Sequence, residues 1–412
     1  MPEPIAVYVH VPFCPTKCGY CDFNSYAMDG EIVERTVKAI AAEIRRSPWA
    51  GRPAKTVFFG GGTPTFLHQD ALVGLLDAVR EVHPPIDGCE ITSEANPGTV
   101  DAAKFRAMRA GGFNRASLGA QSFLDSDLIA LGRVHRGGEI ERAVAAAREV
   151  GFDNLNLDLM FALPDQSRYA WRANLDRALH LEPDHISLYC LTIEPGTAFY
   201  KQALRGEIVQ PDDEAQTEMY EDCLRRTGEA GFVPYEISNF ARPGRECRHN
   251  LEYWTGGEYA AYGPGAVGMV REAPSGDGAP WREERPKGGT VGKGVPGSGA
   301  RASTQAAVAS QAEGVEGGAL RYTNLKHPEH YCATDEKGDH PAYDVERLTD
   351  PDLRTERIML GLRLDAGIRE DGLDPRAVRL LESRGWLEPF GDRLRLTPAG
   401  RHFHSEAAAE LI

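Results

Sequence analysis

The chain lacks the long hydrophobic runs and the basic charge that mark membrane-spanning and nucleic-acid-binding proteins. No stretch of its 412 residues approaches the ~18 apolar residues of a transmembrane helix. Acidic residues outnumber basic ones, 61 to 46, and the formal net charge of -15 argues against DNA or RNA as a partner. The first residues, Met1 to Val11, show no basic start, apolar segment or cleavage site. We therefore expect a cytoplasmic protein.

A disulfide framework is not expected either, although the chain has eight cysteines. In a reducing compartment thiols stay unpaired, so a tight group of cysteines indicates a metal or redox site. Cys14, Cys18 and Cys21 form such a group. The other five are scattered, and each is expected to be a small buried side chain.

Short β-rich runs alternate with amphipathic stretches over the first two-thirds of the chain, which is typical of a parallel sheet built from βα units. The predicted fold class is α/β, with a partial (β/α)6 barrel followed by a C-terminal α+β, winged-helix-like domain. The predicted strands are Ile5–Val11, Lys55–Gly60, Cys89–Glu94, Arg115–Ala120, Asn154–Phe161 and His185–Leu191. The predicted helices between and after them are Glu31–Arg46, Gln69–Val82, Ala102–Ala110, Glu139–Val150, Ala170–Leu181 and Glu214–Ala230.

The three clustered cysteines have the spacing CxxxCxxC, in a loop directly after a predicted strand. Three thiolates can hold three irons of a [4Fe-4S] cluster and leave the fourth iron open. S-adenosylmethionine (SAM) can chelate that iron through its amino and carboxylate groups. A structural zinc site is the alternative, but such sites are normally closed by four ligands. His10 is a poor fourth ligand, since strand alternation turns it away from its neighbours.

A glycine run, Gly60–Gly62, ends the second predicted strand and is followed by Thr63. Glycine lets main-chain groups approach a ligand closely. Alone, the run is most simply a tight turn. After a three-cysteine loop and a βα repeat, it is better interpreted as an edge that binds the methionine part of SAM.

These motifs together resemble the coproporphyrinogen-dehydrogenase-like branch of the radical SAM superfamily, and within it the HemW-type heme chaperones. The resemblance covers nearly the whole chain and implies a [4Fe-4S] cluster on Cys14, Cys18 and Cys21. It implies a SAM site built from residues of the cysteine strand and loop and of the later strand ends: Tyr8, Tyr20, Gly62, Thr63, Glu94, Gln121, Arg133 and Asp158.

Residue chemistry agrees with this assignment. Carboxylates suit the ribose hydroxyls of SAM, and the planar fork of an arginine suits its carboxylate. Taken singly, Glu94 or Asp158 is as easily a helix cap or a loop hydrogen bond, and Gln121 a buried amide that ties strands together. Their joint placement favours the SAM site.

Two features separate the chaperones from the dehydrogenases of this branch. The dehydrogenases usually carry a further cysteine two residues after the third, where this chain has Phe23. The segment from His249 to Trp254 matches the HNxxYW motif that is associated with heme binding in the chaperones. A neutral imidazole is a good heme ligand, and Tyr253 and Trp254 offer flat surfaces to a porphyrin. Without the resemblance, His249 is more simply a buried polar side chain beside a packed aromatic pair.

One position departs from the family pattern. Relatives often read GPGAHS shortly after the HNxxYW motif, whereas this chain has Val267 in place of that histidine. If the histidine serves heme or substrate, this chain has lost that contribution.

The predicted function is a heme chaperone that binds a [4Fe-4S] cluster, SAM and heme and transfers heme to an acceptor protein. An oxygen-independent coproporphyrinogen III dehydrogenase is the alternative, and a radical SAM enzyme acting on another tetrapyrrole is a third. Whether the chain is an enzyme is therefore left open, and no catalytic residue is assigned. The expected partners are heme, a heme-acceptor protein and an electron donor. Peripheral association with the inner face of a membrane and a homodimer stay open.

Four segments are predicted along the chain: the radical SAM partial barrel over 1–240, the heme-motif segment and linker over 241–271, a disordered insertion rich in Gly, Pro and Ala over 272–318, and the C-terminal domain over 319–412. Ala319–Asn324 is predicted to be a strand that forms a hairpin with Ala266–Arg271.

Overall fold

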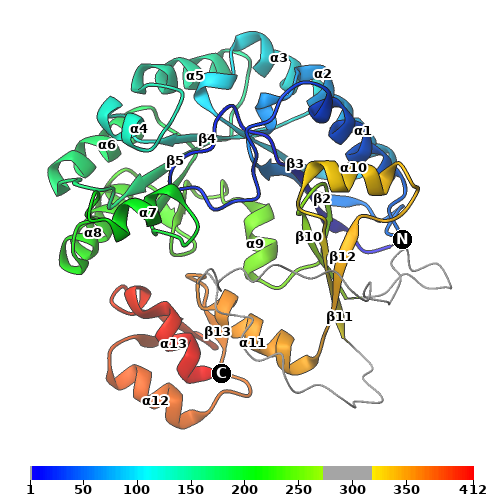
Figure 1. The fold of residues 1–412 in the computed structure, drawn as a ribbon. Helices are drawn as coiled ribbons and strands as arrows, with labels where there is room; N and C mark the ends of the chain where they lie inside the picture. Colours follow the sequence, from blue (N-terminus) through cyan, green and yellow to red (C-terminus); the bar gives the residue numbers. More distant parts are fainter. Residues whose placement is uncertain (1, 272–317) are drawn as a thin grey trace.

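The computed structural model describes residues 2–271 and 318–412 (Figure 1). The insertion predicted over 272–318 lies outside the described residues, apart from Gly318. No helix of the described part is long and apolar enough to cross a bilayer.

Six parallel strands form the centre of a 12-stranded sheet. They are β1 (Ile5–Val11), β2 (Ala54–Gly61), β3 (Pro85–Ala95), β4 (Arg115–Gln121), β5 (Leu155–Phe161) and β6 (His185–Cys190). The helices that follow them along the chain are α1 (Glu31–Arg45), α2 (Gln69–Val82), α3 (Ala102–Gly111), α4 (Asp125–Ala130), α5 (Gly137–Glu149), α6 (Arg168–His180), α7 (Ala198–Leu204) and α8 (Asp213–Glu229). Figure 1 shows most of them as an arc around the outside of the curved sheet, with α7 apart from this arc. This is the predicted partial (β/α)6 barrel.

The two faces of these strands differ in chemistry. On β5, Leu155, Leu157 and Leu159 face the helices in the hydrophobic core, whereas Asn156 and Asp158 alternate with them and face the barrel interior. The same alternation places polar side chains of β3, β4 and β6 inside. The barrel interior is thus lined by polar side chains. Such a lining is typical of a ligand site and differs from the apolar packing that fills a closed barrel.

The sheet continues beyond β1 through four further strands: β9 (Tyr259–Tyr262), β10 (Val267–Val270), β11 (Ala319–Asn324) and β12 (Ala342–Leu348). The predicted hairpin is confirmed, because β10 and β11 pair antiparallel, with Val270 opposite Leu320. The boundary predicted at residue 319 differs from the structure, since β11 and β12 belong to the large sheet. β11 belongs to the large sheet because it is hydrogen-bonded to β10. The order of the elements along the chain does not reveal this pairing. At the opposite edge lie β8 (Asn239–Ala241) and β7 (Val233–Pro234).

Helix α10 (Pro328–Asp335) packs on α1, and the buried carboxylate of Glu43 ties the two together. Glu43 accepts hydrogen bonds from the Tyr331 hydroxyl, the Asn324 amide and the backbone N–H of Gly263. Burial raises the pKa of Glu43 to about 7, against the lowering effect of these donors.

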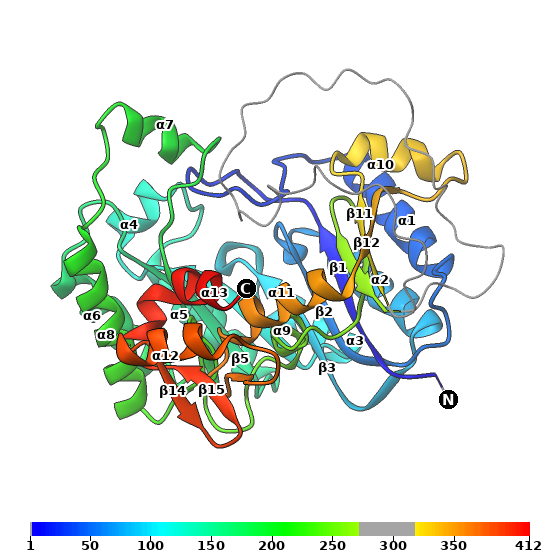
Figure 2. The same ribbon diagram turned by 90° about the horizontal axis from the view of Figure 1, so that it is seen from below.

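The C-terminal residues form a separate small module with its own apolar core. It contains α11 (Asp350–Gly361), β13 (Ile368–Arg369), α12 (Pro375–Ser383), the hairpin of β14 (Leu387–Phe390) and β15 (Arg393–Leu396), and α13 (His404–Leu411). These helices and strands form the predicted C-terminal α+β domain. The module packs on α9 (Arg248–Trp254), and Figure 2 shows α11 beside α9. Arg363 pairs with Glu236, which lies between β7 and β8, at 2.8 Å, and its guanidinium lies 4.6 Å from the Trp254 ring centre.

Candidate functional site

A cavity of about 530 Å³ opens at the carboxyl ends of the parallel strands, where α/β folds place their ligands. We call it the cysteine cavity, because Cys14, Cys18 and Cys21 all line it. Most of the residues predicted for SAM line it as well: Tyr20, Gly62, Thr63, Glu94, Gln121, Arg133 and Asp158. The structure thus brings together residues that span 145 positions of sequence, from Cys14 to Asp158.

The cysteine loop is closed at its base by main-chain hydrogen bonds. The N–H of Cys14 donates to the carbonyl of Tyr26 at 3.0 Å, and the N–H of Tyr26 donates to Pro12 at 2.7 Å. Within the loop, Lys17 Nζ donates to the carbonyl of Phe23 at 2.6 Å and to Ser25 Oγ at 2.9 Å. These contacts hold the loop in one conformation and so position the three cysteine sulfurs.

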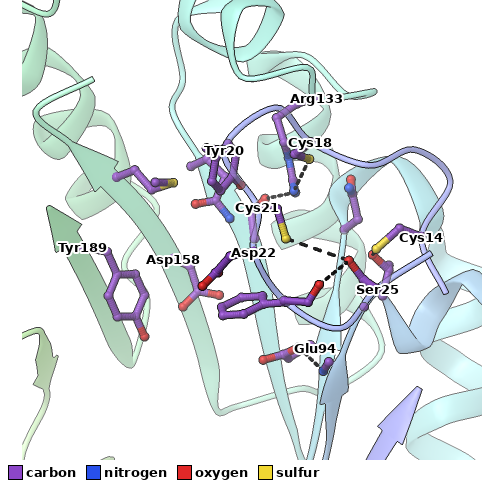
Figure 3. A pocket seen from close by; sticks show the side chains of 18 of the residues that line it. Cys14, Cys18, Tyr20, Cys21, Asp22, Ser25, Glu94, Arg133, Asp158 and Tyr189 are labelled. Atoms are coloured by element: carbon purple, nitrogen blue, oxygen red, sulfur yellow. Dashed lines mark hydrogen bonds between the residues drawn. The ribbon is translucent and has the colours of Figure 1, made fainter. Parts of the chain in front are cut away.

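Each cysteine sulfur has a polar neighbour (Figure 3). Thr63 Oγ1 donates to Cys14 Sγ at 3.5 Å, and Ser25 Oγ lies 3.9 Å from Cys21 Sγ. Arg133 Nη1 donates to Cys18 Sγ at 3.7 Å. Hydrogen bonds to the sulfurs and solvent exposure tune iron–sulfur clusters, so this donor set fits a cluster held by the three thiolates. Burial raises the pKa of the Cys14 thiol and so favours its protonated form. Iron binds the thiolate, so ligation would have to displace this proton.

A mononuclear metal site does not fit the same residues. Among the described residues, no three His, Cys, Asp or Glu side chains converge as a single ion would require. Three cysteines around a shared cavity suit a cubane cluster better, since each then binds a different iron. The ring of His10 is already engaged, with Nε2 on the Asn24 carbonyl at 2.9 Å and Nδ1 on the Tyr8 hydroxyl at 3.0 Å.

Arg133 offers the cavity an unused donor. Its Nη2 donates to the carbonyl of Gly119 at 2.7 Å, while its buried Nε has no hydrogen-bond partner among the described residues. A guanidinium anchored on one side and free on another is suited to a ligand carboxylate, such as that of SAM. Gln121 lies close by with φ of 63°, a left-handed conformation that is rare for glutamine. Such strain at a strand end is common at ligand sites.

Two carboxyl groups form the deeper wall of the cavity. Glu94 accepts from the N–H of Gly61 at 3.2 Å, and burial together with the charge of Asp158 raises the pKa of Glu94 to about 8. Asp158 accepts from Ser117 Oγ at 3.0 Å and from Asn156 Nδ2 at 2.8 Å, and burial raises its pKa as well. A carboxyl group in this setting can bind sugar hydroxyls in either protonation state.

Gly62 holds the second strand directly against the cysteine loop. Its N–H donates to the carbonyl of Val11 at 2.8 Å. A Cβ at this position would lie 2.6 Å from the carbonyl oxygen and 2.8 Å from the nitrogen of Phe13. Both are main-chain atoms next to Cys14, so no side chain can move aside to make room.

Replacing Gly62 by alanine should therefore displace the cysteine loop. We expect a loss of about 1–3 kcal/mol in the free energy of unfolding from overpacking, together with weaker SAM binding. Denaturant unfolding and equilibrium dialysis with labelled SAM measure the two effects. The matched control is Gly74→Ala on α2, where a Cβ meets no atom within 4 Å and stability should rise. Equal behaviour of the two variants would contradict the assigned contact.

Tyr8 lies apart from the other residues predicted for SAM. It lines an adjoining cavity of about 270 Å³ inside the barrel, which we call the lower cavity. Glu94, Ser117, Asp158 and Tyr189 line both cavities. The alternation of β1 explains the difference, because Tyr8 faces inward but lies before the strand ends.

The HNxxYW motif forms α9, which lies at the open side of the barrel (Figure 1). Its Asn250 and Tyr253 line the lower cavity. His249 is buried, with Nδ1 on Thr56 Oγ1 and Nε2 on the Tyr253 hydroxyl, each at 2.9 Å. Burial lowers the pKa of His249 to about 3, so the ring is neutral. Its role as heme ligand stays a prediction, and coordination at Nε2 requires the Tyr253 hydroxyl to move away.

Some residues of the cysteine cavity were not predicted from the sequence. Tyr189 and Cys190 lie on its far wall at the end of β6, and Phe23 lines it with a side chain that is 68% exposed. The polar and apolar alternation of His185, Ser187 and Tyr189 along a buried strand was the signal for this wall.

Comparisons with known proteins agree with the geometry. The family model described as "Radical SAM superfamily" matches residues 8–176. A "Heme chaperone HemW" of Mycobacterium tuberculosis is 34% identical over 407 residues, which cover 97% of this chain and 92% of that protein. The chain belongs to the HemW family of radical SAM proteins.

Other HemW relatives and one solved structure extend the comparison. The Bacillus subtilis "Heme chaperone HemW" is 32% identical and covers 97% of each chain. The Escherichia coli protein of that name is 43% identical, over 65% of this chain and 70% of its own. The solved coproporphyrinogen III oxidase HemN of Escherichia coli matches with a TM-score of 0.76 at 21% identity, covering 100% of this chain and 90% of that one. That likeness shows the fold alone. Radical SAM membership implies a [4Fe-4S] cluster and SAM as the cofactors.

Proposed function

We propose that this protein is a heme chaperone that holds a [4Fe-4S] cluster and SAM in the cysteine cavity, binds heme, and passes it to an acceptor protein. The main support is the identity of 34% with a heme chaperone along 97% of the chain, so that the likeness is not limited to the SAM-binding part. Phe23 adds to it, since the dehydrogenases of this branch usually have a further cysteine there.

The protein's own residues have distinct tasks in this proposal. Cys14, Cys18 and Cys21 hold the cluster, and Arg133 orients the SAM carboxylate. Glu94 and Asp158 hold polar groups of SAM on the barrel wall. When bound, the cluster and SAM supply one-electron chemistry, for which an electron donor would be a further partner.

An anaerobic assay with bound heme quantified on the same sample tests the proposal. Reconstituted protein is incubated with coproporphyrinogen III, SAM and a reductant, and the products are separated by chromatography. We expect stoichiometric heme binding and no catalytic formation of protoporphyrinogen IX. Catalytic turnover would establish the dehydrogenase instead and overturn the chaperone proposal.

A heme titration tests the predicted ligand. His249→Ala should change the Soret absorption and weaken heme binding, because an imidazole nitrogen is then missing from the iron. Tyr253→Phe is the informative companion variant. It removes the hydroxyl that occupies Nε2, so heme should bind at least as tightly as to the wild-type protein. An unchanged spectrum and affinity in His249→Ala would remove His249 from the heme site.

A further inference from the structure

The lower cavity contains a buried positive charge that the assigned functions do not use. Arg115 is the first residue of β4, points into the barrel and is 2% exposed. Its side chain lines the lower cavity and does not line the cysteine cavity. A guanidinium remains charged in proteins. The positive charge of Arg115 therefore lies inside the barrel, on the wall of the lower cavity.

Among the residues that the structure describes, the Arg115 guanidinium has no hydrogen-bonding or ion-pair partner. Its Nε is buried without a hydrogen-bond partner, and it makes no hydrogen bond or ion pair with any described residue. The neighbouring carboxylates are engaged elsewhere. Glu90 accepts from the Cys247 thiol and from the backbone N–H groups of Arg248 and His249 at the start of α9. Asp158 accepts from side chains of β4 and β5.

A buried charge without a direct partner is costly and is seldom kept without a use. Electrostatic attraction from Glu90 and Asp158 lowers this cost but does not fill the hydrogen-bonding positions of the guanidinium. Of the described residues that line only the lower cavity, Arg115 carries the single formal charge, because burial keeps His185 neutral by lowering its pKa. Glu94 and Asp158 also line this cavity, but they are shared with the cysteine cavity, so Arg115 supplies the positive charge of the part that belongs to the lower cavity alone.

One further donor lines the same space, and another unpaired hydroxyl lies next to Arg115 in the sheet. The side-chain amide of Asn250, on α9, lines the cavity and makes no hydrogen bond with a described residue. Thr92, the register partner of Arg115 on β3, has a buried hydroxyl that is likewise without a partner among the described residues. Arg115 of β4 and Asn250 of α9 therefore both present unpaired donors to the lower cavity.

We propose that the lower cavity is a carboxylate-binding subsite, in which Arg115 and Asn250 receive the carboxylate of a short organic acid or of a larger ligand's carboxylate arm. The planar guanidinium matches a carboxylate through two parallel hydrogen bonds. The volume of about 270 Å³ lies below the ~300–1,000 Å³ of pockets for drug-sized ligands, so a short chain fits there. This assignment does not depend on the heme-carrier function.

Propionate is the probe, and propionamide is its uncharged counterpart. Binding of [1-¹³C]propionate to the cluster-reconstituted protein is followed by NMR line broadening. Arg115→Gln should weaken propionate binding at least about tenfold, and Arg115→Lys less. Arg106→Gln, which removes an exposed arginine on α3, should bind propionate as the wild type does. Propionamide should not compete. Equal propionate affinity in wild type and Arg115→Gln, or no binding to wild type, overturns the proposal.

Stability distinguishes a binding group from a structural one. Because Arg115 lacks a direct partner, Arg115→Gln should melt at the same temperature as the ligand-free wild type or higher. If this variant does not fold, Asn250→Ala provides the same affinity test from α9. A threefold or greater loss of propionate binding in Asn250→Ala supports the subsite, and unchanged binding overturns it.

Two further titrations identify the source of the carboxylate once propionate binds. Hemin is compared with hemin dimethyl ester, whose propionate arms are blocked. If a tetrapyrrole arm enters the subsite, Arg115→Gln weakens hemin binding but not ester binding. If a free acid is the occupant, only propionate binding changes. Either pattern supports the carboxylate subsite and names its source.

Discussion

Cys18→Ser should leave the reconstituted protein without its iron–sulfur cluster. Serine replaces one of three thiolates, and the remaining cavity offers no matching sulfur in the loop. Arg133 also loses the Sγ to which it donates at 3.7 Å. We expect iron and sulfide contents to fall close to those of unreconstituted protein, with loss of the visible absorption and of the reduced-cluster EPR signal. SAM should then no longer perturb any EPR spectrum.

The control for this prediction is another cysteine of the same cavity. Cys190 lies on the far wall, outside the CxxxCxxC loop, and contacts Gln216 at 3.4 Å. Cys190→Ser should keep full iron content and the SAM-dependent change in the spectrum. An intact cluster in Cys18→Ser, or loss of the cluster in Cys190→Ser, would contradict the assigned ligand set.

Glu94→Gln should make the ligand-free protein more stable while weakening SAM binding. Glu94 has a pKa of about 8 in the folded protein against 4.5 as the ordinary value, because burial disfavours its charge. At pH 7 the folded state must therefore keep this carboxyl protonated, or bury its charge, while the unfolded chain ionises it freely. Removing the group should add about 2–3 kcal/mol to the free energy of unfolding at pH 7, after allowance for water in the cavity.

The pH dependence gives this prediction its sign. Between pH 4.5 and 8 the folded state holds more protons at Glu94 than the unfolded state does, so this group lowers stability as pH rises. The stability difference between Glu94→Gln and wild type should be near zero at pH 4.5, grow with pH, and level off above 8. Urea unfolding at several pH values measures it. A difference that stays constant with pH would show that Glu94 does not titrate in this range.

Strand periodicity predicted the barrel well. The six parallel strands begin and end within a few residues of their predicted limits, because each alternates a buried apolar face with a second, polar face. The long helices between them were predicted for the same reason. Helices α4, α7 and α9 were missed, since they have only 6, 7 and 7 residues and show no full amphipathic period.

The site was predictable where motif and strand end coincide. Gly62, Thr63 and Gln121 follow this rule and line the cysteine cavity. Tyr8 does not, because the depth of a side chain within the barrel depends on the stagger of neighbouring strands, which a single sequence does not reveal. Arg115 carried no signal either. Alternation puts Arg115 on the same inward face of β4 as Ser117, but the sequence alone does not reveal that the first residue of this strand is buried.

The hairpin of β10 and β11 has a practical consequence for protein engineering. Val270 and Leu320 are cross-strand partners, so the chain leaves and re-enters the sheet at nearly the same place. When the two ends of a loop are held together by the sheet, lengthening the loop adds little to the conformational entropy lost on closing it. This position is therefore a natural insertion point for a fluorescent reporter or an affinity tag. A reporter placed there would be carried by the barrel sheet itself, leaving both chain termini and the cysteine loop unmodified.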